Sequence, residues 1–253
     1  MKYTSGVLGS SPRGRTLKKI IYLRGSWFES KRADSMQTVV ITGISRGIGK
    51  ALAEKFLREG YAVMGTSSTG ISGIKNAHLT VFQLDLSNSK SIEMCTKEIS
   101  SRGKKIDILI NNAGVWSNNE NDSALRVELL RKVMEVNLFG TVDFTEHIIP
   151  LMNEGGHLLT ITSRAGSFSH VHAATYPDYK ISKAALNMAV RIWTFRLKGK
   201  IIVSAVHPGW VKTDMGGPQA DIEPQEAAED IFKLATSRPE TGQFWFKGEK
   251  FPW

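Results

Sequence analysis

The feature that most constrains how this chain can fold is a regular alternation, from Gln37 onward, of short apolar runs with longer stretches of helical pattern. The apolar runs are rich in β-branched residues, which favour strands, and the longer stretches carry apolar residues on one side of a helix. Strands that are apolar throughout and alternate with helices are typical of a parallel sheet covered on both faces. The alternation therefore predicts an α/β fold, a Rossmann-like doubly wound parallel sheet of about seven strands with helices on both faces.

The predicted elements have definite limits in the sequence. Strands are expected at Thr38–Thr42, Tyr61–Thr66, Leu79–Leu84, Ile106–Ile110, His157–Thr162, Ile201–Val206 and Gln243–Phe246. Helices are expected at Ile48–Arg58, Ser91–Arg102, Tyr176–Leu197 and Pro224–Ser237, with a long helical region, Leu125–Met152, that contains Asn137. Open sheets of this kind bind ligands beyond the carboxyl ends of their strands. Functional residues are therefore expected just after residues 42, 66, 84, 110, 162 and 207.

The positive charge of the chain is concentrated at its N-terminus. Residues 1–35 hold eight Lys and Arg against two acidic residues, which is six of the formal net charge of +9. The remainder is only mildly basic, so nucleic-acid binding is not expected, although the slight excess suits an anionic cofactor. Residues 1–35 are predicted to be a disordered basic extension, and three origins stay open: a flexible tail, a start upstream of a true initiator at Met36, and a transit-like peptide. Residues 36–253 are predicted to form one Rossmann-like domain.

Composition also bears on location. No apolar run has the length needed to cross a bilayer, so a soluble protein with no membrane partner is expected. The single cysteine, Cys95, excludes an internal disulfide and fits a reducing compartment such as the cytoplasm, with organelle import through the extension left open. His157, His170, His172 and His207 lack the spacing of metal ligands, so no metal site is predicted.

A glycine-rich turn, Thr42–Gly49, joins the first predicted strand to the first predicted helix with the spacing G-x-x-x-G-x-G. Glycines at such a turn let the backbone bend tightly and approach a pyrophosphate, and the helix N-terminus offers free N–H groups to the phosphates. The spacing differs from the G-x-G-x-x-G of the common dinucleotide fingerprint. A turn without function has the same composition, so the motif alone indicates a nucleotide site without proving one.

Four further blocks follow in order: Asn111-Asn112-Ala113-Gly114, Asn137 in Val-Asn-Leu-Phe-Gly, Tyr179 with Lys183, and Pro208-Gly209 followed by Thr213. With the glycine turn, these blocks resemble the short-chain dehydrogenase/reductase family, and the resemblance covers essentially Gln37 to the C-terminus. The stretch His207–Gly217 and the closing Phe251-Pro252-Trp253 are similar, more narrowly, to the C-factor and sniffer-type carbonyl reductase branch. The resemblance implies an oxidoreductase that exchanges a hydride between a nicotinamide cofactor and a carbonyl compound.

The predicted cofactor is NADP(H). An NAD site generally places an acidic residue after the second strand to bind the ribose 2′-hydroxyl, whereas Gly65–Thr69 contains no carboxylate. Hydroxyl groups at Thr66 and Ser67, with Arg46 nearby, would instead bind a 2′-phosphate, although Arg46 also has the character of a solvated surface residue.

The resemblance extends the cofactor site to residues in every block. The predicted set is Gly43, Ser45, Arg46, Gly47, Ile48, Gly49, Thr66, Ser67, Asp85, Leu86, Asn112, Ala113, Gly114, Tyr179, Lys183, Pro208, Gly209, Val211 and Thr213. By resemblance, Asp85 contacts the adenine ring, Asn112 fixes its loop near the adenosine ribose, and Thr213 contacts the nicotinamide carboxamide. A helix cap is the simpler role for Asp85, and the two roles are compatible.

Tyr179 and Lys183 are four residues apart on a predicted helix, so their side chains project from one face. The phenol pKa of a free tyrosine is about 10, too high for efficient proton transfer near neutrality, and an ammonium nearby would lower it. In a reduction, Tyr179 would donate a proton to the carbonyl oxygen while the cofactor delivers hydride to carbon. By resemblance, Lys183 also holds the nicotinamide ribose.

Two further catalytic residues are implied by the resemblance. Ser163 would orient the substrate carbonyl, although a loop cap is the commoner role of such a serine; because the interval to Tyr179 is long, Ser167 and Ser169 are alternatives. Asn137 would hold a water in a proton relay to Lys183, or would simply be a polar kink in the long helix.

The substrate pocket is predicted to be lined by Val115, Trp116, Ser163, Trp210 and Met215, with the loop Arg164–Thr175 as a wall. These side chains suit a small or medium apolar aldehyde, ketone or quinone. A nucleotide-bound regulatory protein with a reductase-like fold is the alternative, because fold alone does not establish activity. The resemblance also implies a homodimer or homotetramer.

Overall fold

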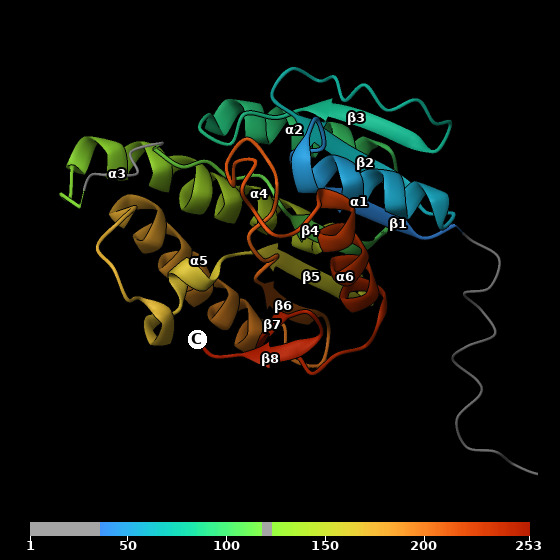
Figure 1. Ribbon diagram of the computed structural model, residues 1–253. Coiled ribbons are helices and arrows are strands. Elements are labelled where there is room, and N and C mark those ends of the chain that lie inside the picture. Colours follow the sequence, from blue (N-terminus) through green and yellow to red (C-terminus); the bar gives the residue numbers. More distant parts are fainter. Residues whose placement is uncertain (1–35, 118–122) are drawn as a thin grey trace, which may run out of the picture. The chain divides into compact units, whose positions relative to one another are not determined.

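The computed structural model describes residues 36–117 and 123–253 (Figure 1); the predictions made for residues 1–35 lie outside this part. Its strands are β1 (Thr38–Ile41), β2 (Ala62–Ser67), β3 (Leu79–Gln83), β4 (Ile106–Asn111), β5 (Met152–Ile161), β6 (Ile202–Val206), β7 (Gln243–Phe246) and β8 (Glu249–Phe251). They form one sheet in the order β3-β2-β1-β4-β5-β6-β7-β8, parallel from β3 to β7. The predicted doubly wound parallel sheet is confirmed, and its strand order reverses between β1 and β4.

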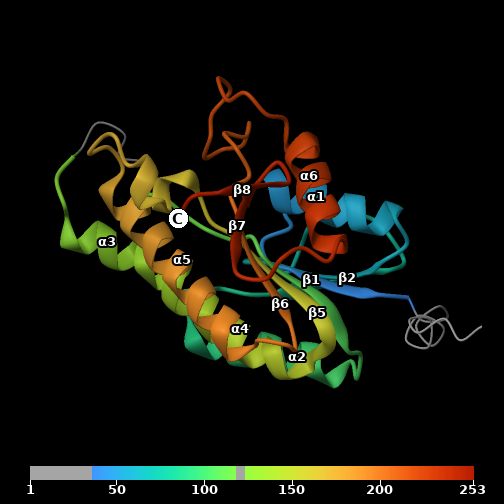
Figure 2. The ribbon, with the colours of Figure 1, turned by 90° about the horizontal axis from the view of Figure 1, so that it is seen from below.

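Helices cover both faces of this sheet, as Figure 2 shows. Helices α1 (Gly47–Arg58) and α6 (Pro224–Thr236) pack on one face; α2 (Ser89–Ser101), α4 (Thr141–Ile148) and α5 (Pro177–Arg196) pack on the other. Successive residues of a strand belong alternately to the two cores, because side chains alternate across a strand. Leu109 and Leu158 lie in the α2/α4/α5 core, whereas Ile110 and Leu159 lie in the α1/α6 core. No helix in the described ranges is long and apolar enough to span a membrane.

The long helical region predicted at Leu125–Met152 is divided in the structure. It contains α3 (Val127–Met134), a π-helical turn (Glu135–Gly140), α4 and a 3-10 turn (Ile149–Leu151), and Met152 already begins β5. The prediction of helix up to Met152 was therefore wrong at its end, where Pro150 in the 3-10 turn cannot continue a helical hydrogen-bond ladder. The π-helical turn contains Asn137, in agreement with the predicted kink.

The strand β8 was not predicted. It pairs antiparallel with β7 after a two-residue turn, Lys247-Gly248, in which both residues have positive φ angles of 49° and 81°. Such a turn matches the twist of a hairpin and favours glycine at its second position. The Lys-Gly pair between two aromatic segments was thus a usable local signal for a hairpin.

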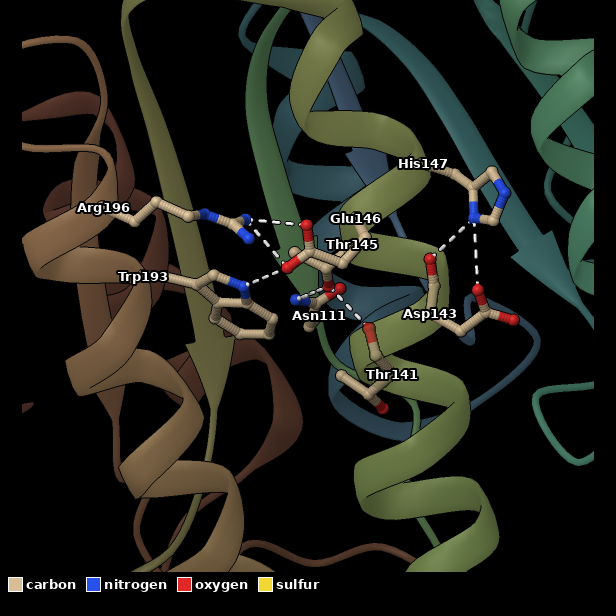
Figure 3. A network of polar contacts seen from close by, with 8 residues as sticks. All are labelled: Asn111, Thr141, Asp143, Thr145, Glu146, His147, Trp193 and Arg196. Carbon is tan, nitrogen blue, oxygen red and sulfur yellow. Dashed lines mark hydrogen bonds and ion pairs between the residues drawn. The ribbon is translucent and has the colours of Figure 1, made fainter.

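A polar network joins β4, α4 and α5 (Figure 3). The Glu146 carboxylate accepts a hydrogen bond from the Trp193 indole at 2.8 Å and two from the Arg196 guanidinium, both at 2.8 Å. Beneath it, the buried Asn111 side chain donates to Thr145 Oγ1 at 2.8 Å. Asn111 is the last residue of β4, so the network fixes the point at which the chain leaves this strand.

Candidate active site

A cavity of about 770 Å³ lies at the carboxyl edge of the sheet, beside the reversal of strand order between β1 and β4. Most of the predicted site residues line it: Gly43, Ser45, Arg46, Gly47, Ile48, Gly49, Thr66, Ser67, Asp85, Leu86, Asn112, Ala113, Gly114, Val115, Trp116, Tyr179, Lys183, Pro208, Thr213 and Met215. Asn137, Ser163, Gly209, Trp210 and Val211 are not among its lining residues. The sequence prediction did not include Lys50, Glu54, Ser68 or Lys212, which also line the cavity.

The glycine turn is built as a close-packed cradle. Gly43 and Gly47 have positive φ angles of 74° and 56°, which residues with side chains rarely adopt. At Gly49 a Cβ atom would lie 2.1 Å from the Gly43 carbonyl oxygen and 2.4 Å from the Asn112 amide nitrogen. The first turn of α1 thus packs directly on the loop, and its N-terminus faces the cavity as an anion site requires. These features fit a dinucleotide pyrophosphate.

Thr42 and Asn112 connect this cradle to the loop that follows β4. The Thr42 hydroxyl accepts hydrogen bonds from the backbone N–H groups of Asn112 and Ala113, both at 3.0 Å. In return, the Asn112 side-chain amide donates to the carbonyls of Thr42 at 2.9 Å and Gly43 at 3.2 Å. Asn112 therefore shapes the cofactor cavity through the backbone of the glycine turn. Sequence reasoning missed Thr42, whose only signal was a hydroxyl at the end of the first strand.

The end of β2 carries hydroxyl groups and no carboxylate, as the sequence predicted. Thr66 Oγ1 accepts from the Gly43 N–H at 3.3 Å. The buried Ser67 hydroxyl donates to the Ile71 carbonyl at 2.8 Å and accepts from its N–H at 2.9 Å, so it closes the turn after the strand. The neighbouring Ser68 is exposed and lines the cavity, which makes its hydroxyl more accessible to a ligand than that of Ser67.

Arg46 forms an ion pair with Asp214 across the cavity rim. The distance from Arg46 Nη1 to Asp214 Oδ2 is 3.1 Å, and both side chains are largely exposed. Beside this pair, a Cβ at Gly47 would lie 3.1 Å from Thr213 Cγ2, so the segment after β6 approaches the glycine turn closely. Arg46 was predicted to be a phosphate ligand or a solvated residue, and its partner Asp214 was not predicted.

The predicted capping role of Asp85 is wrong, because Asn88 is the N-cap of α2 and accepts a hydrogen bond from the Ser91 N–H. Asp85 instead accepts from the N–H and hydroxyl of Ser87, and these hydrogen bonds lower its carboxyl pKa. The carboxylate lies at the cavity wall, so its predicted contact with an adenine ring remains a prediction.

Tyr179 and Lys183 share the face of α5 that borders the cavity. Lys183 is 4% exposed, and its Nζ donates to the Ile161 carbonyl at 3.0 Å. Burial lowers the pKa of Lys183 to about 8, which still leaves an ammonium at neutral pH. Its Nζ lies 5.7 Å from the centre of the Tyr179 ring.

The phenol pKa of Tyr179 is raised above its ordinary value, because burial disfavours the phenolate more than a hydrogen bond from Ser163 favours it. Lys183 was predicted to lower this pKa, but in the structure the effect of burial is larger and the pKa rises. The phenol is thus protonated at neutral pH, and a lower pKa for proton transfer would depend on the positive charge of Lys183 and of the oxidised nicotinamide.

Ser163 follows β5 and faces Tyr179. Its hydroxyl oxygen accepts a hydrogen bond from the Ala165 N–H at 3.1 Å, which caps the short 3-10 turn Arg164–Gly166. The alternatives Ser167 and Ser169 direct their hydroxyls elsewhere, to the carbonyls of Pro252 at 2.9 Å and Trp253 at 3.2 Å. Of the three serines, only Ser163 has a described interaction with the Tyr179 phenol.

Asn137 is 1% exposed, and its side chain is fully engaged with protein groups. Its Oδ1 accepts from the Val115 N–H at 2.8 Å, and its Nδ2 donates to the Val115 carbonyl at 2.8 Å and to Ser182 Oγ at 3.0 Å. A Cβ at Gly114 would contact both Asn137 Oδ1, at 3.3 Å, and Lys183 Nζ, at 3.5 Å. The π-helical turn thus places Asn137 and Lys183 on either side of Gly114, and the water-mediated relay between them remains a prediction.

Ser182 completes this arrangement and was missed from the sequence. It is fully buried, and its hydroxyl donates to the Tyr179 carbonyl at 2.8 Å. The hydrogen bonds among Val115, Asn137, Ser182 and Tyr179 therefore connect the loop after β4 to α5. A small polar residue three positions after Tyr179, on the same helical face, was the available signal.

The predicted substrate wall is only partly assembled in the structure. Val115, Trp116 and Met215 line the cavity, and the Trp116 ring lies 5.3 Å from that of Tyr176. Tyr176 has a left-handed backbone conformation, with φ of 54°, which is rare for a bulky residue and occurs here at the entrance to α5. Trp210 is 46% exposed, and its indole N–H donates to the Gly216 carbonyl at 2.8 Å. The described residues contain no cluster of potential metal ligands.

The α/β fold thus has a cavity at the carboxyl edge of its sheet, with the glycine turn on one wall and the pair Tyr179 and Lys183 on another. The chain belongs to the short-chain dehydrogenase family: the family model described as short chain dehydrogenase matches residues 37–224. The family predicted from the sequence is thereby confirmed.

Individual relatives agree with this assignment. The chain is 31% identical to 1-hydroxy-2-glutathionyl-2-methyl-3-butene dehydrogenase of Rhodococcus sp., over 83% of this chain and 96% of that protein. It is 34% identical to C-signal of Myxococcus xanthus, over 58% of this chain and 93% of that protein. Its fold is similar to the NADPH-bound carbonyl reductase from chicken fatty liver, with a TM-score of 0.77, 25% identity, and coverage of 86% of this chain and 99% of that chain.

Proposed function

We propose that this protein is an NADPH-dependent carbonyl reductase in which Tyr179 is the general acid. The observation that carries the proposal is the position of the Tyr179 phenol on the wall of the dinucleotide cavity, with the Lys183 ammonium 5.7 Å from the centre of its ring. A regulatory protein would need the cofactor cavity but not this proton-transfer group. The similarity to an NADPH-bound carbonyl reductase also favours the proposal.

In the proposed reaction, bound NADPH would supply the hydride to the carbonyl carbon. The residues of this chain would handle the oxygen: Ser163 would donate a hydrogen bond to it, and the Tyr179 phenol would transfer its proton as the alkoxide forms. The nearby Lys183 ammonium would stabilise the resulting phenolate, which would regain a proton from water before the next turnover. The products are the alcohol and the oxidised cofactor.

The preference for NADPH over NADH rests on the residues at the end of β2. A carboxylate there would repel a 2′-phosphate, and the described loop offers the Ser68 hydroxyl instead, while Arg46 lines the same cavity. Hydrogen bonds from hydroxyl and guanidinium groups to a phosphate are charge-assisted and correspondingly strong.

The test compares the consumption of NADPH and NADH by the purified protein across a panel of aldehydes, ketones and quinones. Tyr179→Phe is expected to lower the turnover number by about 10²–10⁴-fold, the usual contribution of a general acid, with NADPH binding retained. Tyr61→Phe is the matched control, because Tyr61 packs between Phe56 and Phe232 on the α1/α6 side of the sheet.

Equal activity in Tyr179→Phe would remove this residue from its role, and a preference for NADH would overturn the cofactor assignment. Tight NADPH binding by the wild-type chain with no turnover on any substrate would favour the regulatory alternative.

A further inference from the structure

The C-terminal segment, Phe251–Trp253, lies against the loop that follows β5. The buried Ser167 hydroxyl donates to the Pro252 carbonyl at 2.9 Å, and the Ser169 hydroxyl donates to the Trp253 carbonyl at 3.2 Å. The His170 ring lies 4.5 Å from the Phe251 ring. The two hydrogen bonds join residues 85 and 84 positions apart in the sequence, so they arise only in the folded chain.

The C-terminal segment is itself held by contacts with β7 and α5. Phe251 is the last residue of β8 and pairs with Phe244 of β7, which is fully buried. The Trp253 ring lies 5.3 Å from the Phe244 ring, and the Arg191 guanidinium of α5 lies 5.5 Å from the Trp253 ring. The segment is thus attached to both the sheet and α5, and it can serve as a support for the loop.

The C-terminal segment contacts the loop at Ser167, one turn after Ser163. The 3-10 turn Arg164–Gly166 closes with a hydrogen bond from the Gly166 N–H to the Ser163 carbonyl at 2.9 Å. The Gly166 carbonyl accepts from the buried Asn187 amide of α5 at 3.1 Å. The next residue, Ser167, is 0% exposed and is held by the C-terminal segment. A shift of Ser167 would therefore move the tight turn, and with it Ser163.

We propose that the C-terminal segment positions Ser163 for the carbonyl substrate by holding Ser167, so that Ser167 and Pro252 are positioning residues of the reductase site. This inference rests on the proposed function, in which Ser163 binds the carbonyl oxygen. The cofactor cradle is made by the loops after β1, β2 and β4, to which Ser167 and the C-terminal segment contribute no hydrogen bond in the described residues. The two sides of the site are thus separable by substitution.

Ser167→Ala removes the donor to Pro252, together with a contact of 3.3 Å between the Ser167 hydroxyl and His170 Nδ1 inside the same loop. We expect kcat for carbonyl reduction to fall about tenfold, because small displacements of a positioning group weaken catalysis strongly. The dissociation constant and the KM for NADPH should stay within about twofold of wild type, since net effects of one distant hydrogen bond are small. Ser169→Ala removes the hydrogen bond to Trp253. Because this position is exposed, kcat should fall only about twofold.

Ser237→Ala is the matched control. Ser237 also donates from its hydroxyl to a backbone carbonyl, that of Leu234 at 2.9 Å, at the end of α6 and away from the loop. Its kcat should equal that of the wild type.

Hydrogen exchange provides a readout that does not depend on activity. In Ser167→Ala, the amides of residues 164–170 should exchange about tenfold faster, with the amides of β1 unchanged, because the local opening free energy falls by roughly the net worth of one hydrogen bond. Unchanged exchange with full kcat would overturn the proposal. Equal losses of kcat and NADPH affinity would also overturn it, because they would indicate a general effect on the fold. A wild-type chain that reduces no carbonyl would refute the proposed function, while hydrogen exchange would still decide whether the segment holds the loop.

Discussion

The glycine turn, on the cofactor side of the cavity, packs directly on neighbouring backbone and is also joined by side-chain hydrogen bonds to the loop after β4. The loop after β5, which would be the carbonyl side in the proposed reaction, is joined by side-chain hydrogen bonds to the C-terminal segment. On the first side, Gly49 packs against the Gly43 carbonyl, and Asn112 bonds the backbone of the same turn. On the second side, Ser167 depends on the carbonyl of Pro252. Backbone packing therefore makes the cofactor side rigid, whereas the position of the carbonyl side depends on the C-terminal segment.

This difference suggests how the two sides can vary. The glycine turn tolerates little change at Gly49, because an added Cβ there meets the Gly43 carbonyl oxygen. A loop supported by side-chain hydrogen bonds can be altered residue by residue at a cost of about 1 kcal/mol each. Residues of the carbonyl side can therefore be substituted with less effect on nucleotide binding than residues of the glycine turn.

The largest effect is expected at the cofactor side. Gly49→Ala places a Cβ 2.1 Å from the Gly43 carbonyl oxygen, so the glycine turn or α1 must shift. Overpacking of this kind costs about 1–3 kcal/mol, and NADPH binding should weaken by up to roughly 100-fold. The dissociation constant, measured by the fluorescence of bound NADPH, tests this expectation.

Gly60→Ala serves as its control, because a Cβ at Gly60 meets nothing within 4 Å and only the backbone conformation, with φ of 82°, is disfavoured. It should lower stability without changing NADPH affinity. If Gly49→Ala bound NADPH as tightly as the wild type, the glycine turn would accommodate a side chain despite its close contacts. The two sides of the cavity would then not differ in rigidity.

Most residues predicted for the cofactor side line one cavity in the structure, and sequence patterns could find them because their signals are local. The spacing of Gly43, Gly47 and Gly49 and the four-residue step from Tyr179 to Lys183 each lie within one turn and one helix. The carbonyl side could not be predicted in the same way, because the partner of Ser167 lies 85 residues away and depends on the unpredicted β8 hairpin. Local reasoning also chose the wrong cap for α2, since several polar residues near its start compete for one role.

Acidification is expected to lower the free energy of unfolding through two buried histidines on the carbonyl side. Both buried histidines among the described residues, His157 on β5 and His207 after β6, lie in the half of the sheet that carries Ser163. Burial lowers the pKa of each to about 4, against about 6.5 in the unfolded chain. Their neutral forms therefore stabilise the fold above pH 6.5, and this contribution is lost as the pH falls towards 4, by about 3 kcal/mol for each residue.

Urea unfolding at pH 7 and pH 4.5 measures this loss. His157→Gln removes one of the two groups and should lose about half as much stability on acidification as the wild type. An identical pH dependence in the variant would show that His157 does not titrate in this range.

The smallest effect concerns the ion pair at the cavity rim. Asp214 holds Arg46 at 3.1 Å, and an exposed pair of this kind contributes about 0.2–1 kcal/mol. Asp214→Asn would release the guanidinium for a 2′-phosphate and remove a negative charge from the rim, so NADPH should bind up to about fivefold more tightly while NADH changes little. Arg46→Ala should lower NADPH affinity alone. Equal changes for both cofactors would place the effect at the pyrophosphate, which they share, and Arg46 would then belong to the rigid cradle and not to cofactor choice.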